Sequence, residues 1–180
     1  SYIKENGKCF KEFLQSVDEM KWAKDPLVSI FMDGCAEKRK DVSEGAAKYN
    51  NYGITTVALS NVGDSLFNIK KLVFKDKKYS LAEMNKARVE NFDSAPEMFI
   101  EVTSLKKSYG HDNAEVEVLV NRITSSIASI AKSYHNALGG TVKFGLSSPG
   151  YNILSKRMSA DFSGRKSGKP YNTHISCTDA

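Results

Sequence analysis

The sequence predicts an α+β protein that is predominantly α-helical and has a few short strands. Three observations lead to this prediction. Apolar residues recur at helical spacing through most of the chain. Two Ser-x-x-Glu capping boxes mark helix starts. Near the C-terminal end, apolar and polar residues alternate instead, which is typical of a strand.

The N-terminal part is predicted to hold two helices. The first carries an apolar stripe of Phe10, Phe13, Leu14, Val17 and Met20. The second begins at Asp25-Pro26, because Asp is a favoured N-cap and Pro is tolerated at the first helical position. The second stripe comprises Val28, Phe31, Met32 and Cys35.

The middle of the chain is less regular. Over residues 44–63 the periodicity does not decide between a loop and a helix, and helical spacing resumes over residues 65–74. The two capping boxes follow, at Ser80 with Glu83 and at Ser94 with Glu97 around Pro96. Each box predicts the start of a helix.

The longest helical pattern begins near Asp112 and Glu115, which are suited to capping. Gly139-Gly140 is expected to end it through a left-handed C-cap. After the glycines, Val142, Phe144 and Leu146 alternate with polar or small residues and predict a strand. Residues 147–150 and 163–170 are expected to be turns, and residues 174–177 a final short strand.

Composition indicates one globular domain over residues 1–180, because 41% of residues are apolar and 10% aromatic. The three cysteines are odd in number and widely separated, which favours reduced thiols and a cytoplasmic location. No apolar run approaches the roughly 18 residues that a membrane span requires, so no membrane partner is expected.

The net charge of +5 does not by itself indicate nucleic-acid binding. Lys and Arg are scattered among acidic residues, as on a solvated surface, so no nucleic-acid partner is expected. A small basic helical module that binds a protein or a nucleic acid, without catalytic activity, stays open as an alternative function.

Several motifs resemble known sites without completing them. Residues 163–170 lack the first glycine and the hydroxyl of a P-loop, and residues 145–149 lack the last glycine of a nucleophile elbow. His174 and Cys177 have the spacing of half a zinc site with no second half, so no metal is expected.

Cys35 and Glu37 form the sharpest local signal, because such a pair combines a thiol with a carboxylate base. The other interpretation is that Cys35 completes the apolar stripe of its helix, as free cysteines commonly do.

Four segments carry further information through their order along the chain. They are residues 35–50, 61–74, 109–116 and 160–170, the last reading Ala-Asp-Phe-Ser-Gly-Arg-Lys-Ser-Gly-Lys-Pro. In this order they resemble consecutive blocks of the glycyl radical (pyruvate formate-lyase-like) enzyme family. The resemblance implies an internal or C-terminal-half fragment of the family's ten-stranded α/β-barrel, from an uncharacterised branch.

The resemblance also implies a function for a larger parent. Such a parent, of anaerobic metabolism, performs radical lyase, dehydratase or acyltransferase (formate acetyltransferase-like) chemistry through glycyl and thiyl radicals. This chain shows no Arg-Val-x-Gly-Tyr radical loop, since Gly150-Tyr151 comes before the fourth block rather than after it. The fragment alone is therefore expected to be inactive.

The same resemblance implies cofactors and partners. No cofactor is expected in this chain, whereas the parent would be activated by an enzyme that uses S-adenosylmethionine and an iron–sulfur cluster. The implied partners are the remainder of the parent enzyme, the radical-activating enzyme and, as a further candidate, a second copy in a homodimer.

Candidate site residues follow from the matched blocks. Cys35 and Glu37 imitate the family's catalytic Cys-x-Glu, although the run directly behind them marks a later, structural cysteine. Arg165 is expected to pair with a buried carboxylate or with an anionic substrate group. Structural roles are expected for the helix cap Asp64 and for the turn residues Gly164 and Gly168.

Overall fold

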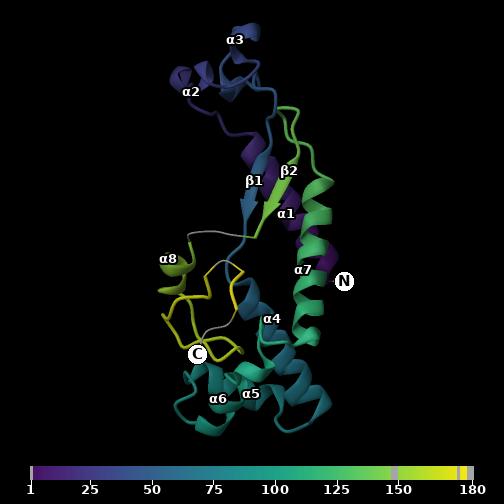
Figure 1. Ribbon diagram of the computed structural model, residues 1–180, viewed down its shortest axis with the longest axis vertical. Helices are drawn as coiled ribbons and strands as arrows, with labels where there is room; N and C mark the ends of the chain where they lie inside the picture. Colours follow the sequence, from purple (N-terminus) through teal and green to yellow (C-terminus); the bar gives the residue numbers. More distant parts are fainter. Residues whose placement is uncertain (1, 147–149, 174, 178–180) are drawn as a thin grey trace. The chain divides into compact units, whose positions relative to one another are not determined.

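The computed structural model describes residues 2–146, 150–173 and 175–177 (Figure 1). Helices dominate, and the sheet within these residues has two strands, which confirms the predominantly helical α+β class. Within these residues, none of the helices is long and apolar enough to cross a membrane.

The chain divides into two compact units. Unit 1 comprises Ser1–Ile54 and Ser126–Phe144, and unit 2 comprises Thr55–Ser125 and Gly145–Ala180. The single domain expected over residues 1–180 stays a prediction, which a single cooperative unfolding transition would support.

Unit 1 contains a small parallel sheet packed against helices. Tyr52 N donates to Thr141 O at 3.0 Å, and Thr56 N donates to Gly145 O at 3.1 Å. The strands β1 (Tyr52–Thr55) and β2 (Val142–Gly145) therefore run in the same direction, as their arrows do in Figure 1. Leu14 of α1 (Tyr2–Asp18), Ala131 of α7 (Ala114–Lys132) and Val142 form the buried core of this sheet region.

The remainder of unit 1 is a segment of short helices. Asp25 caps α2 (Pro26–Ile30) by accepting the Val28 N–H, which confirms the predicted start. The predicted apolar stripe is wrong, because Gly34, at φ +95°, separates α2 from α3 (Cys35–Lys38). Cys35 alone of that stripe is buried, whereas the side chain of Phe31 is 80% exposed.

Unit 2 is helical and has two apolar cores. In the first, α5 (Leu81–Val89) and α6 (Pro96–Val102) bury Met84 and Met98 beside Phe92. In the second, α4 (Leu59–Asn68) packs on the first half of α7 through Phe67 and Val116. The remaining elements of unit 2 are the π-helix Ile69–Lys75, the 3-10 helix Leu105–Lys107 and α8 (Tyr151–Ser155).

The two predicted capping boxes have different outcomes. Ser80 and Glu83 form theirs at the start of α5, which confirms the prediction. The box of Ser94 with Glu97 is not formed, although the helix that it predicts, α6, does begin at Pro96. Pro96 occupies the first helical position, so Ala95 becomes the N-cap and the Ser94 hydroxyl donates to Glu90 instead.

The end of α7 and the C-terminal strand also differ from the predictions. The helix ends at Lys132 rather than at Gly139-Gly140, because Asn136 organises a turn there by accepting the N–H groups of Leu138 and Gly140. Residues 175–177 form no strand, and His174 lies outside the described residues, as do residues 147–149 of the predicted turn.

Candidate functional site

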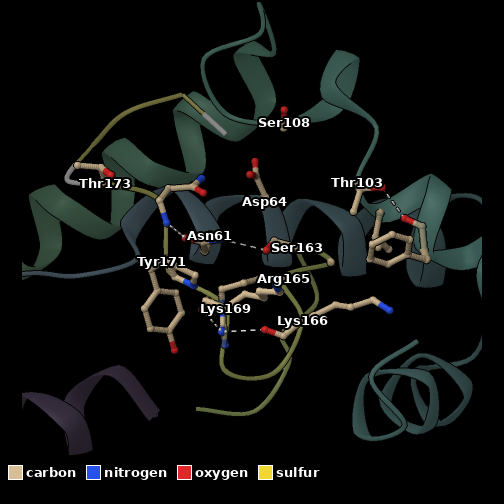
Figure 2. A pocket seen from close by; sticks show the side chains of 15 residues that line it. Asn61, Asp64, Thr103, Ser108, Ser163, Arg165, Lys166, Lys169, Tyr171 and Thr173 are labelled. Atoms are coloured by element: carbon tan, nitrogen blue, oxygen red, sulfur yellow. Dashed lines mark hydrogen bonds between the residues drawn. The ribbon is translucent and has the colours of Figure 1, made fainter. Parts of the chain in front are cut away.

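Unit 2 contains a cavity of about 520 Å³ between α4, α6 and residues 161–173, called here the C-terminal turn region (Figure 2). The lining residues are Asn61, Asp64, Phe99, Val102, Thr103, Ser108, Ser163, Gly164, Arg165, Lys166, Lys169, Pro170, Tyr171, Asn172 and Thr173. Amide, hydroxyl and cationic groups therefore outnumber apolar ones in this lining.

A polar face of α4 forms one wall of the cavity region. Asn61, Asp64 and Asn68 recur at helical spacing, and all three are buried. The Asn68 side-chain amide donates to Val102 O at 3.0 Å and to Phe162 O at 2.9 Å. This face therefore holds α6 and the C-terminal turn against α4.

Asp64 acts inside α4 rather than as its cap. The helix begins at Leu59 with Ala58 as the N-cap, so the predicted capping role is wrong. The Asp64 carboxylate instead accepts the N–H of Tyr109 at 2.6 Å, and its side chain points towards Ser108 in Figure 2. The structural role expected for Asp64 is thus carried out between segments that are distant in sequence.

Asn61 links α4 to both ends of the turn region. Its amide donates to Ser163 Oγ at 3.2 Å, and its carbonyl accepts the Asn172 N–H at 3.0 Å. Sequence reasoning missed Asn61 and Asn68. Their signal was a polar stripe, spaced as a helical face, in a segment otherwise made of small and apolar residues.

The Arg165 guanidinium makes its hydrogen bonds within its own turn. Its Nε donates to the Asp161 carboxylate at 2.9 Å, so its partner is a carboxylate as expected, although a half-buried one rather than a buried one. Its Nη1 and Nη2 atoms donate to the carbonyl oxygens of Ser159, Lys166 and Lys169. These bonds use most of the N–H donors that a guanidinium carries. The geometry favours anchoring of the turn, and the substrate-binding role stays a prediction.

The two turn glycines, Gly164 and Gly168, differ in whether a side chain would have space. Gly164 has φ +92°, and a Cβ there would lie 2.4 Å from Thr103 Cγ2. Gly168 has φ +74°, but a Cβ there would meet only Lys156 O, at 4.0 Å. Gly164 is therefore required by both conformation and space, and Gly168 by conformation alone.

Two cationic side chains of the lining, Lys166 and Arg165, have acidic and aromatic partners. Lys166 pairs with Asp93 at 3.0 Å and lies over the Phe99 ring, while the Arg165 guanidinium stacks 4.2 Å from the centre of the Tyr171 ring. Within the described residues, no group of three His, Cys, Asp or Glu side chains could hold a metal ion.

Cys35 and Glu37 are not among these lining residues and belong to α3 of unit 1. Cys35 is 3% exposed and packs with Ala46, Ala47 and Val42, whereas Glu37 is exposed. A thiol enclosed by small apolar side chains fits the packing role that free cysteines commonly take. The catalytic assignment of this pair stays a prediction.

Unit 1 also contains a carboxylate–tyrosine cluster that sequence reasoning missed. The Tyr134 hydroxyl donates to Asp18 at 2.5 Å, and this bond raises the pKa of Tyr134 to about 12. Burial raises the pKa of Asp18, but hydrogen bonds from Tyr134, Ala137 N–H and Tyr52 outweigh it, so the net pKa lies below the ordinary value. The cluster fastens the end of α1 to the turn after α7.

Comparison with known proteins matches residues 13–155 to the family model "Pyruvate formate lyase-like". The chain is 30% identical over 152 residues to (2S)-3-sulfopropanediol dehydratase of Klebsiella oxytoca, covering 83% of this chain and 18% of that protein.

Two solved structures are similar as well. The glycerol-bound B12-independent glycerol dehydratase from Clostridium butyricum matches with a TM-score of 0.78 and 30% identity, over 87% of this chain and 20% of that one. A glycyl radical enzyme from Archaeoglobus fulgidus matches with a TM-score of 0.77 and 29% identity, over 86% of this chain and 20% of that one. The chain thus spans about one fifth of the length of these relatives.

Proposed function

We propose that this chain forms part of a larger glycyl radical enzyme that removes water from a small hydroxylated compound. The chain belongs to the pyruvate formate lyase-like family, which is the basis of this proposal. Two matched relatives are named as dehydratases of 3-sulfopropanediol and of glycerol, both of which carry neighbouring hydroxyl groups. These relatives are enzymes, so the alternative of a basic binding module finds no support in them.

The observation that carries the first part of the proposal, that this chain belongs to a larger enzyme, is the parallel pairing of β1 with β2. Each strand has four residues, and the sheet within the described residues has no others. Parallel sheets occur almost only as larger sheets with both faces covered, and a two-stranded sheet is marginal in water. Further strands of a parent barrel would supply that missing sheet.

In the proposed parent, an activating enzyme with S-adenosylmethionine and an iron–sulfur cluster generates a glycyl radical, which a cysteine relays to the substrate. This chain contributes scaffold to that chemistry: α4, with Asn61 and Asn68, positions the turn that Arg165 stabilises. Cys35, with Glu37 as base, is its candidate for the relaying thiol, although the burial of Cys35 favours packing. The chain alone is expected to turn over nothing.

The test is anaerobic expression of the complete reading frame together with a radical-activating enzyme. We expect a glycyl radical signal in electron paramagnetic resonance and dehydration of glycerol or 3-sulfopropanediol. The 180-residue chain, treated identically, is the control and should show neither. Absence of the radical from the activated full protein would refute the proposal. Turnover by the chain alone would refute its role as a part of a larger enzyme.

A further inference from the structure

Three large apolar side chains of α2 and its C-cap residue are exposed to solvent, a surface called here the α2 face. It comprises Leu27, Ile30 and Phe31, which are 70%, 71% and 80% exposed. Their spacing places them on one side of a helix. Single exposed apolar residues are ordinary, but adjacent ones on one face mark an interaction surface.

The opposite side of α2 is fixed by hydrogen bonds. Ser29 is buried, donates from its hydroxyl to Asp41 at 2.8 Å and accepts the Val42 N–H at 2.9 Å. The Asp41 carboxylate also accepts the N–H of Asp25 and both the N–H and the hydroxyl of Ser43. The helix cannot rotate its apolar face inward without breaking these bonds, so the face is presented in a set orientation.

The segment around α2 has no core of its own that could receive the face. Its buried apolar residues are Cys35, Ala46 and Ala47, with Val42 partly buried against them. These side chains are smaller than the three exposed ones. Burial of the α2 face therefore requires apolar surface from outside the segment.

We propose that the α2 face docks on an apolar surface of the remaining polypeptide of the parent enzyme. The inference rests on the proposed function, because it needs a longer chain. The relatives are about five times longer than this chain, so such a chain has ample surface to offer.

The area of the face disfavours a second copy of the chain as the occupant. A stable dimer buries about 800 Å² on each partner, more than three side chains supply. Within a single longer chain, the α2 face would be only one part of a larger buried surface, so it need not supply about 800 Å² alone.

The test compares thiol accessibility in this chain and in the product of the complete reading frame. Phe31→Cys places a thiol on the α2 face, and Ala82→Cys places a control thiol at an exposed position of α5. Maleimide labelling is quantified at each peptide by mass spectrometry, with circular dichroism to verify the fold. We expect position 31 to react at least about tenfold more slowly in the monomeric full protein than in the 180-residue chain, with a smaller change at position 82.

Equal reactivity at position 31 in both proteins would overturn the docking. Protection that disappears when dimers are diluted to monomers would also overturn it, in favour of a second copy. Labelling requires no radical, so the docking and the proposed function are tested independently. Protection of position 31 without dehydratase activity would support the docking and contradict the function. Dehydratase activity with an unprotected position 31 would support the function and contradict the docking. A reading frame limited to these 180 residues would overturn both.

Discussion

Unit 2 and the α2 segment of unit 1 are held together by different interactions. Unit 2 buries large apolar side chains, among them Met84, Met98 and Phe92. Residues 20–49 of unit 1 bury only small ones and depend on hydrogen bonds that converge on Asp41. Burial stabilises in proportion to apolar area, whereas each hydrogen bond contributes about 0.5–1.5 kcal/mol net and depends on its geometry.

Hydrogen bonds allow the α2 segment to be ordered while it still exposes apolar surface. Directional bonds to Asp41 fix the backbone around α2 without requiring Leu27 or Phe31 to be buried. In unit 2 the order and the burial coincide, because the same side chains provide both. We therefore expect substitutions to act through packing in unit 2 and through hydrogen bonding in the α2 segment.

The largest expected effect comes from emptying the core of unit 2. Met84 is fully buried, so Met84→Ala should lower the free energy of unfolding by about 2–5 kcal/mol, measured by urea denaturation. Phe31→Ala is the control at an exposed aromatic and should change it by less than about 0.5 kcal/mol in the 180-residue chain. Equal losses of unfolding free energy from both substitutions would contradict the difference assigned to the two regions.

A smaller effect is expected at the turn glycines. Gly164→Ala adds a clash with Thr103 to an unfavourable backbone conformation, so it should cost about 1–3 kcal/mol or more. Gly168→Ala meets the conformational penalty alone, about 1–2 kcal/mol. Thermal unfolding of the two variants gives the difference. A variant at Gly168 that unfolds at the lower temperature would contradict the assigned roles.

Asp41→Ala should loosen the α2 segment and leave unit 2 intact. The Asp25 N–H, Ser43 N–H and Ser29 hydroxyl lose their acceptor, so exchange of the Asp25 and Ser43 amides should accelerate at least about tenfold in hydrogen-exchange measurements. Amides of α5 are the internal reference. Uniform acceleration in both units would show that Asp41 stabilises the whole chain rather than its own segment.

The same carboxylate makes the α2 segment sensitive to acid. Hydrogen bonds from the Ser43 hydroxyl and N–H, the Asp25 N–H and the Ser29 hydroxyl hold the pKa of Asp41 well below its ordinary value. Its stabilising contribution is therefore present above the unfolded-state pKa, about 3.9, and is lost as the pH falls further. In wild-type protein, hydrogen-exchange protection of the Ser43 amide should therefore fall as the pH drops below about 3.9. In Asp41→Ala this loss of protection in acid should be absent.

The smallest effect is expected at high pH. The pKa of Tyr134 is raised from 10.0 to about 12 by its bond to Asp18, so the stabilisation is complete below pH 10 and is lost as the pH rises towards 12. Tyr134→Phe should weaken this alkaline dependence of the melting temperature, while Tyr49→Phe, at an exposed ring, should leave it unchanged. The remaining dependence comes from Tyr52, Tyr79 and Tyr109, whose pKa values are also raised by burial. An unchanged pH profile in Tyr134→Phe would contradict the assigned coupling to Asp18.

Much of the fold could be predicted from local patterns. The Asp25 N-cap, the Ser80–Glu83 capping box and the strand at Val142 depend on neighbours in sequence, and the structure confirms them. Two predictions failed because a neighbouring residue took over the position. Pro96 moves the N-cap of α6 to Ala95, and α7 ends at Lys132, before a turn that Asn136 organises ahead of the glycines.

The helical class, the family and the turn that contains Arg165 could all be predicted from the sequence, because periodicity, capping and ordered motifs are local properties. The partners of the buried polar groups became visible in the tertiary structure: Asp64 with Tyr109, Asn68 with Phe162, and Asp41 with Ser29. It also decided that Phe31 lies outside while Cys35 lies inside. A helical stripe specifies that apolar residues share a side, but which side is buried depends on where distant polar groups find their hydrogen bonds.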